Sequence, residues 1–380
     1  MQTVYVDSQS LLTTVLPALG SETTYLAIDT EFRRENTYFP ELGLIQIATI
    51  DTIFIIDAIA ISNLSPLFDL LTSPNILKVF HSARQDLEIF CHLMHGQVVR
   101  SIFDTQIAAM FLGYGESAGF ETLVSKQLGV TLDKTSRHTD WTARPLTDKQ
   151  RSYAINDVLH LRTLYDVLSQ KLVEKGRFNW VMEEGRVFEN ADFLITPPAD
   201  AWRRFSLRST SARSLALVKA LAAWREDTAQ RTNVPRTWLL KDEVILDIAL
   251  RKPTSLEALH RIRHFPSDDP VLEKDVVACI QTVLQRPDSE LPQASHPAAL
   301  SKSTHVLLDT VKLLLKITAN QLELSPKLIA ENDELVQWIR SPLKEPQDKG
   351  WRYDVFWKKA EALFHGDIKI QVQKGKVTVE

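Results

Sequence analysis

Hydrophobic and polar residues follow two different patterns along the chain, and the change falls near its middle. In the first 175 residues, short apolar runs are separated by segments with helical periodicity. The runs that predict strands are 25–30, 44–49, 53–57, 77–81 and 98–103, with a hairpin turn at 50–52. The segments that predict helices are 62–71, 83–95, 105–112, 122–128 and 147–174. Three early strands followed by alternating helices and strands predict an α/β domain over residues 1–175, with a mixed sheet flanked by helices.

The strand pattern disappears beyond this domain. Residues 212–285 have helical periodicity, and helical patterning resumes over 304–366. We interpret 176–211 and 286–303 as linkers, because prolines and small polar residues interrupt the periodicity there. Residues 367–380 form a C-terminal tail, in which 368–372 alternate as in a strand without an identifiable partner. The sequence therefore predicts two small all-α domains after the α/β domain.

Acidic residues and one tyrosine stand out in the α/β domain. Asp29 and Glu31 end a buried strand, and side chains that are two residues apart on a strand point to the same face. Tyr153 and Asp157 are four residues apart in a helical segment, so they share one helix face. Asp86 lies near the start of another helix. Clustered carboxylates repel one another unless hard cations lie between them, and oxygen ligands suit Mg²⁺ or Mn²⁺. Such a cluster can support two-metal hydrolysis of a phosphodiester.

Each of these residues also has an ordinary structural explanation. The strand pair could mark where a buried strand emerges into a loop, and the helix pair could be an amphipathic contact. Asp86 alone could be a solvated helix position. Asp104 follows a strand-like run and opens a helix, so we interpret it as an N-cap and not as a metal ligand. Only the ordered set of acids, at these separations, favours a metal site.

The residues around these acids resemble the DEDD exonuclease superfamily, in the branch that has a tyrosine before the last aspartate. Residues 29–40 with 43–48, 81–87 and 153–158 are similar to the three exonuclease motifs of the bacterial ribonuclease D family, and 140–147 are similar to the segment before the third motif. The resemblance implies a ribonuclease H-like fold and a 3′–5′ exoribonuclease. The implied reaction trims the 3′ ends of tRNA precursors and other structured RNAs and releases nucleoside 5′-monophosphates.

The resemblance also implies roles for the five residues. Asp29, Glu31 and Asp157 would hold one Mg²⁺ or Mn²⁺ ion that activates water. Asp29 would place the second ion beside the leaving oxygen, with Asp86 supporting it through coordinated water. Tyr153 would orient the attacking water, because a phenol with a pKa of ~10 is a poor base at neutral pH.

The helical half resembles the HRDC domain, a small helical module that accompanies ribonuclease D catalytic domains. The matching stretches are 221–225, 233–238 and 248–259. Residues 320–330, 338–339 and 351–364 resemble a degenerate second copy. The resemblance thus covers nearly the whole chain.

Charge is distributed unevenly between these parts. The whole chain has a net charge of −4. Residues 1–170 contain 12 Lys and Arg against 19 Asp and Glu, a net charge of −7. Residues 201–265 contain 13 against 6, a net charge of +7, which suits phosphate binding. The alternative is that these basic residues only form a solvated surface and do not bind phosphates.

Composition narrows the remaining possibilities. Two cysteines far apart suit a reducing compartment, and we find neither a secretory signal nor an apolar run long enough to span a membrane. We therefore expect a cytoplasmic monomer whose partner is RNA with a free 3′ end. Two other functions remain open, a proofreading-type DNA 3′–5′ exonuclease and a non-catalytic RNA-binding scaffold. The presence of all four acids and the tyrosine argues against the scaffold.

Overall fold

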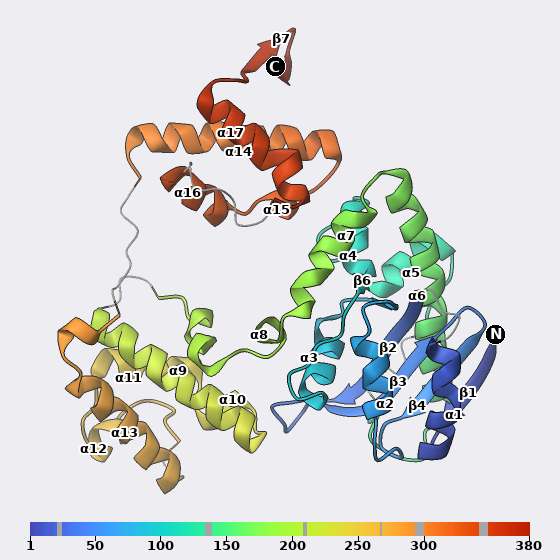
Figure 1. Ribbon diagram of the computed structural model, residues 1–380. Helices are drawn as coiled ribbons and strands as arrows, with labels where there is room; N and C mark the ends of the chain where they lie inside the picture. The colour runs from blue at the N-terminus through green and yellow to red at the C-terminus, as the bar shows by residue number, and fades with distance from the viewer. Residues whose placement is uncertain (21–24, 134–138, 208–210, 267, 293–299, 342–348) are drawn as a thin grey trace.

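The computed structural model describes the chain except residues 21–24, 134–138, 208–210, 267, 293–299 and 342–348 (Figure 1). The mixed sheet predicted for the N-terminal domain is confirmed, with the strand order β1-β4-β3-β2-β5-β6. Its strands are β1 (Gln2–Val6), β2 (Tyr25–Arg33), β3 (Glu41–Ala48), β4 (Thr52–Asp57), β5 (Leu77–Phe80) and β6 (Ile102–Asp104). The pairs β2/β3 and β3/β4 are antiparallel, and β1/β4, β2/β5 and β5/β6 are parallel.

Helices cover both faces of the sheet, and the strand β2 shows how the two faces are separated. Its Ala27 packs in the hydrophobic core that contains α6, α4 and α5, whereas its Leu26 and Ile28 pack in the core that contains α1, α2 and α3. Alternation along the strand therefore sends odd-numbered side chains to the α6 face and even-numbered ones to the α3 face. The helices are α1 (Gln9–Gly20), α2 (Ser65–Thr72), α3 (Arg84–Leu93), α4 (Thr105–Phe111), α5 (Phe120–Leu128) and α6 (Asp148–Glu174).

Some local predictions differ from the structure. The first strand and helix, β1 and α1, were not predicted, and β6 is shorter than the predicted run 98–103. Ser101 explains the shorter strand, because its φ of 58° lies in the left-handed region and interrupts an extended backbone. The predicted N-cap at Asp104 is confirmed, since its side chain accepts a hydrogen bond from the amide of Gln106 at the start of α4.

The segment 176–211, which we interpreted as a linker, is largely helical where it is described. It contains α7 (Phe178–Gly185), η1 (Arg186–Glu189), α8 (Ala191–Leu194) and η2 (Pro198–Arg204), while residues 208–210 lie outside the described residues. The helix α7 packs closely against β6: a Cβ atom at Gly185 would lie 2.4 Å from the carbonyl oxygen of Ile102. The first part of this segment is therefore bound tightly to the sheet domain.

The C-terminal half consists of two helical units with related backbones. The first unit is α9 (Ala212–Thr232), α10 (Arg236–Leu239), α11 (Asp242–Arg251), α12 (Leu256–His260) and α13 (Pro270–Gln285). The second is α14 (Lys302–Leu322), α15 (Pro326–Ile329), α16 (Asn332–Arg340), η4 (Tyr353–Trp357) and α17 (Lys358–His365). Ser211 and Ser301 cap α9 and α14, and both helices end in a left-handed residue, Asn233 or Glu323. This correspondence, 90 residues apart, supports the interpretation of a repeated module.

The sequence also predicted a linker between the two helical units and a strand in the C-terminal tail. The predicted linker 286–303 contains η3 (Asp288–Glu290), and its residues 293–299 lie outside the described residues. The strand expected in the tail is present as β7 (Ile370–Gln373), and its partner is β8 (Lys376–Val379) in a two-stranded hairpin. Across the described parts of the chain, no helix has the length and apolar character needed to cross a membrane.

The first helical unit is attached to the sheet domain through the loop after β2. The Tyr38 hydroxyl donates a hydrogen bond to the buried Glu226 of α9, and Arg236 donates to both the Tyr38 oxygen and Glu226. The amide of Phe39 donates to Oδ1 of Asn233 at 2.9 Å. These contacts hold the first unit against the loop that follows the strand carrying Asp29 and Glu31.

The second helical unit contacts the sheet domain at a different place. Trp351 stacks on Trp180 of α7 with ring centroids 4.9 Å apart, and its indole nitrogen donates to Glu184. Arg177 donates to the carbonyl oxygen of Leu322, at the end of α14. Both helical units are therefore held against the N-terminal domain by aromatic contacts and charged hydrogen bonds.

Candidate active site

Three of the predicted acids come together on the α6 face of the sheet. Asp29 and Glu31 are odd-numbered residues of β2, so they point to this face, and Asp157 approaches from α6. One carboxylate oxygen from each residue lies within 4.8 Å of the others. A Mg²⁺ ion binds oxygens at about 2.1 Å, so ligand oxygens around one ion lie up to about 4.2 Å apart. The three carboxylates thus fit a divalent cation after a small inward movement of their side chains.

Burial makes the charged form of Asp29 unfavourable when no cation is bound. Burial raises the pKa of Asp29 from 3.8 to about 6, although the backbone amide of Thr30 opposes the shift by hydrogen bonding. A cation would favour the ionised form, because the attraction replaces the solvation that the carboxylates lose on burial. The electrostatics of Asp29 therefore agree with the fit of its oxygens to a metal ion.

Asp86 lies nearby but approaches β2 from the other face. It is in the first turn of α3, is 7% exposed, and accepts a hydrogen bond from the hydroxyl of Thr30. Burial, and next the charge of Asp29, raise the pKa of Asp86 well above its usual range. Within the described parts of the chain, the group of three clustered carboxylates does not include Asp86. Its position behind the cluster is compatible with an indirect, water-mediated role.

Tyr153 lies one helical turn before Asp157 and shares its face of α6. Burial raises the pKa of Tyr153, and the charges of Asp157, Glu31 and Asp29 raise it further. The phenol therefore remains protonated at neutral pH and acts as a hydrogen-bonding group rather than as a base. The buried ring of Trp141 lies 5.9 Å from the Tyr153 ring and limits its movement.

The segment before α6 fixes the helix that carries Tyr153 and Asp157. Arg144 donates to both carboxylate oxygens of the buried Asp57 at 2.6 Å and to the carbonyl oxygen of Gly43. Thr147 and Gln150 form a capping box at the start of α6. The segment 140–147, noted for its resemblance alone, therefore has a structural purpose: it anchors α6 to β3 and β4.

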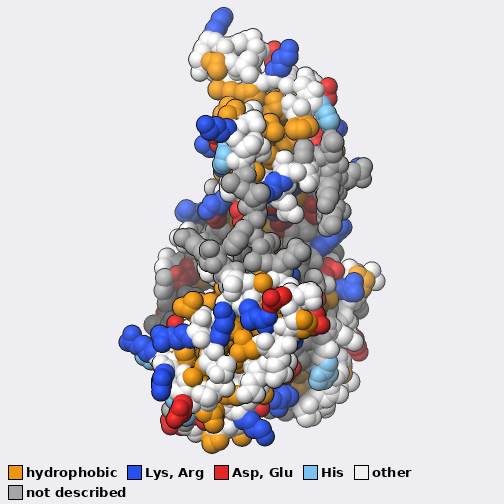
Figure 2. Space-filling view, turned by 90° about the vertical axis from the view of Figure 1, so that its left-hand side faces the viewer, with side chains coloured by type: hydrophobic (Ala, Val, Ile, Leu, Met, Phe, Trp, Pro, Cys, Tyr) orange, Lys and Arg blue, Asp and Glu red, His pale blue; other side chains and the backbone are white. Residues whose placement is uncertain are grey.

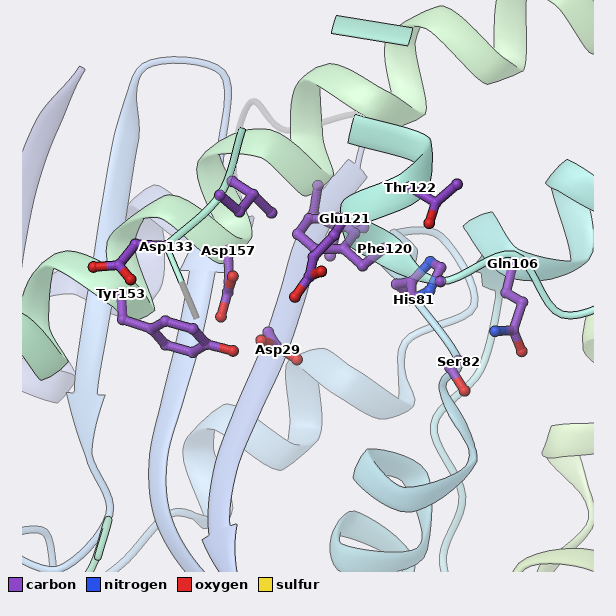
Figure 3. Close-up of a pocket in the computed structure, with 13 residues that line it drawn as sticks. Asp29, His81, Ser82, Gln106, Phe120, Glu121, Thr122, Asp133, Tyr153 and Asp157 are labelled. Atoms are coloured by element: carbon purple, nitrogen blue, oxygen red, sulfur yellow. The ribbon is translucent and has the colours of Figure 1, made fainter. Parts of the chain in front are cut away.

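A cavity of about 350 Å³ opens beside the three acids (Figure 3). Asp29, Tyr153 and Asp157 form one part of its lining. The remaining wall comes from the β5–α3 turn, from α4, from α5 and the residues on either side of it, and from α6: His81, Ser82, Gln106, Gly119, Phe120, Glu121, Thr122, Leu132, Asp133 and Leu161. Apart from His81 and Ser82, which lie in the segment 81–87 that resembles an exonuclease motif, none of these residues was predicted, because they come from several elements that only the tertiary fold brings together.

Comparison with known proteins identifies an exonuclease domain followed by an HRDC domain, which is the order expected from the sequence. A family model described as a 3′–5′ exonuclease matches residues 3–173, and an HRDC domain model matches residues 214–268. The ribonuclease D of Zymomonas mobilis is 40% identical over 366 residues, which cover 94% of this chain and 93% of that protein. The ribonuclease D of Nitrobacter hamburgensis is 38% identical over 93% of both chains.

A solved structure resembles the whole chain. The crystal structure of Escherichia coli RNase D, described as an exoribonuclease involved in structured RNA processing, matches with a TM-score of 0.84 and 29% sequence identity. The match covers 96% of this chain and 99% of that one. It therefore includes the sheet domain and both helical units.

Proposed function

Because the chain belongs to the ribonuclease D family and is a 3′–5′ exoribonuclease, we propose that it trims the 3′ ends of tRNA precursors and other structured RNAs. The products would be nucleoside 5′-monophosphates. The observation that carries the proposed site is the proximity of the Asp29, Glu31 and Asp157 carboxylates beside a cavity large enough for a nucleotide.

In the proposed mechanism, acidic residues of β2, α3 and α6 hold two divalent ions, Mg²⁺ or Mn²⁺. Asp29, Glu31 and Asp157 would hold one ion, and Asp29, with Asp86 acting through water, would hold the other. The chemistry that such ions supply is a lower pKa of coordinated water and stabilisation of charge on the leaving oxygen.

Tyr153 would orient the attacking water. Its protonated hydroxyl donates a hydrogen bond to Asp157, which leaves the oxygen lone pairs to accept one from the water. Trp141 would keep the ring in place during this step. The burial and nearby negative charge that raise its pKa support a positioning role and argue against direct proton abstraction by the phenol.

The charge difference between the two helical units supports a role for the first unit in RNA recruitment. Residues 201–265 have a net charge of +7, whereas the corresponding residues 291–355, 90 positions later, contain 8 Lys and Arg and 8 Asp and Glu. Figure 2 shows Lys and Arg side chains on one face of the first unit, which is the lower one in that view. We propose that this unit binds RNA phosphates and that the second unit mainly braces the sheet domain. We also propose a monomer that acts in the cytoplasm.

A 5′-labelled tRNA precursor with a 3′ extension tests the substrate proposal. With Mg²⁺ or Mn²⁺, we expect shortening in single-nucleotide steps and a higher kcat/KM than on the extension alone. The Asp157→Asn variant, which keeps the side-chain shape, serves as the inactive control. Equal or faster cleavage of the isolated extension would contradict a preference for structured RNA, and faster cleavage of matched DNA would favour the proofreading alternative.

A further inference from the structure

The cavity wall opposite the acids contains a histidine whose protonation the structure determines. His81 follows β5 and lines the same cavity as Asp29 and Asp157. In the view of Figure 3, Asp29 lies between Tyr153 and His81. The proposed mechanism assigns no role to this imidazole.

Hydrogen bonds fix which ring nitrogen of His81 carries the proton. Nδ1 of His81 lies 2.9 Å from the hydroxyl oxygen of Thr105, and that hydroxyl donates to the carbonyl oxygen of Phe80 at 3.1 Å. A hydroxyl has a single hydrogen, so toward His81 the Thr105 oxygen can only accept. Nδ1 must therefore be the donor. In the neutral ring, Nε2 is then left with a lone pair.

The lone pair of Nε2 is available to a ligand. Within the described parts of the chain Nε2 has no hydrogen-bond partner, and it is not among the polar atoms that are sealed from solvent. Burial lowers the pKa of His81 to about 4, so the ring is neutral at physiological pH. Because the ring also lines the cavity, Nε2 acts there as an acceptor.

The backbone around His81 is held rigidly. The buried Asp104 carboxylate accepts hydrogen bonds from the amides of Ser82 at 3.0 Å and Ala83 at 2.9 Å. These bonds stabilise the left-handed backbone of Ser82, whose φ is 57°. The ring of Phe120 packs against the imidazole, with the two ring centroids 5.3 Å apart. The acceptor is therefore fixed in place before any substrate binds.

A nucleotide held at the acids would bring its sugar into the adjoining part of this cavity. This step rests on the proposed function, in which the 5′ phosphate of the terminal nucleotide lies at Asp29 and Asp157. Phosphate oxygens are acceptors and cannot bind an unprotonated nitrogen, whereas ribose hydroxyls are donors. Donor groups on the bases differ from base to base, but every RNA nucleotide carries the same sugar. An enzyme that removes successive nucleotides needs such a constant feature.

We propose that Nε2 of His81 accepts a hydrogen bond from a hydroxyl of the 3′-terminal ribose, which makes His81 a positioning and sugar-selecting residue. The 2′ and 3′ hydroxyls share this chemistry, and substrates that lack one or the other distinguish them. The proposal predicts that sugar selection depends on this one nitrogen.

Two substitutions of His81 separate its two nitrogens. In His81→Asn, the amide nitrogen can replace Nδ1 and keep the bond to Thr105, but nothing replaces Nε2. In His81→Gln, the longer side chain can return an oxygen acceptor to the position of Nε2. Single-turnover removal of the first nucleotide would be measured on linear RNA ending in ribose, 2′-deoxyribose or 3′-deoxyribose.

The wild-type protein should lose ~10-fold in kcat/KM on one of the two deoxy ends, as expected for one hydrogen bond to a substrate hydroxyl. His81→Asn should lose ~10-fold on the ribose end and show no further loss on that deoxy end. His81→Gln should recover most of the discrimination. A structural role would instead lower the rate on all ends equally. The proposal would be overturned if His81→Asn discriminated between ribose and deoxyribose ends as well as the wild type does. It would also be overturned if the wild type did not discriminate between these ends.

A second pair of variants tests the proton assignment without changing the histidine. Thr105→Val removes the acceptor for Nδ1–H, whereas Thr105→Ser retains it. We expect reduced discrimination between sugars in the Val variant and wild-type discrimination in the Ser variant. Equal discrimination in both would refute the proton assignment. Failure of the wild type to shorten all-ribose linear RNA from its 3′ end would instead refute the proposed function, so the two failures are distinguishable.

Discussion

The substitution Asp29→Asn tests both the electrostatics of the carboxylate cluster and its proposed purpose. Asparagine keeps the shape of the side chain and removes its charge. In metal-free protein at pH 8, this change should remove a destabilising interaction and raise the melting temperature. With a saturating divalent ion the order should reverse, because the wild-type protein alone gains the full stabilisation of ligand binding.

The expected magnitude follows from the pKa of Asp29. Burial raises this pKa from 3.8 to about 6, so the folded protein binds the proton more tightly than the unfolded chain. Stability from this group is therefore present at low pH and is lost as the pH rises from about 4 to about 6. The loss is ~3 kcal/mol at pH 8 and less than ~1 kcal/mol at pH 4. For a domain of this size, ~3 kcal/mol corresponds to ~6–12 °C in melting temperature.

Thermal melting in EDTA at pH 8 and at pH 4 measures the effect. Asp69→Asn, a change at an exposed position of α2, is the matched control and should have little effect at either pH. A lower melting temperature for Asp29→Asn in EDTA at pH 8 would refute the reasoning. So would an equal increase at both pH values, since the gain would then not come from the removed charge.

Three further outcomes are expected. Tyr153→Phe should lower kcat by ~10²–10⁴-fold while Mn²⁺ affinity, measured by calorimetry, stays unchanged; loss of Mn²⁺ binding would identify the phenol as a ligand. Arg144→Met should lower the free energy of unfolding by ~3–5 kcal/mol in urea, because it leaves the buried charge of Asp57 without its cationic partner. Arg33→Met breaks a half-exposed ion pair and should have a much smaller effect, so equal losses would contradict this explanation. Neutralising three basic residues of the first helical unit should lower the salt slope of tRNA-precursor binding by up to ~3, and an unchanged slope would favour bracing over recruitment. The residues, all exposed, are Lys241, Arg261 and Arg263.

Local rules were sufficient to predict part of the candidate site. Asp29 and Glu31 share a strand face, and Tyr153 and Asp157 share a helix face, because alternation and helical periodicity depend only on spacing along the chain. The capping box at Thr147 is local in the same sense. Together these rules predict which acidic side chains point the same way.

The rest of the site depends on contacts between distant segments. Spacing could not show that Asp86 meets Thr30 on the α3 face of the sheet rather than joining the three clustered carboxylates. The cavity wall at His81 and Phe120 requires the turn after β5 to meet the start of α5. The first strand was missed because it lies at the sheet edge, where Gln2 and Thr3 are exposed and polar, so its apolar run is only three residues long.

Cleavage of one RNA in linear and circular form tests the central claim most directly. The claim is that the site beside Asp29, Glu31 and Asp157 removes nucleotides one at a time from a free 3′ end. With a divalent ion present, linear RNA labelled at its 5′ end should shorten in single-nucleotide steps, and the circular form should remain intact. Internal cuts in the circular RNA would contradict the account.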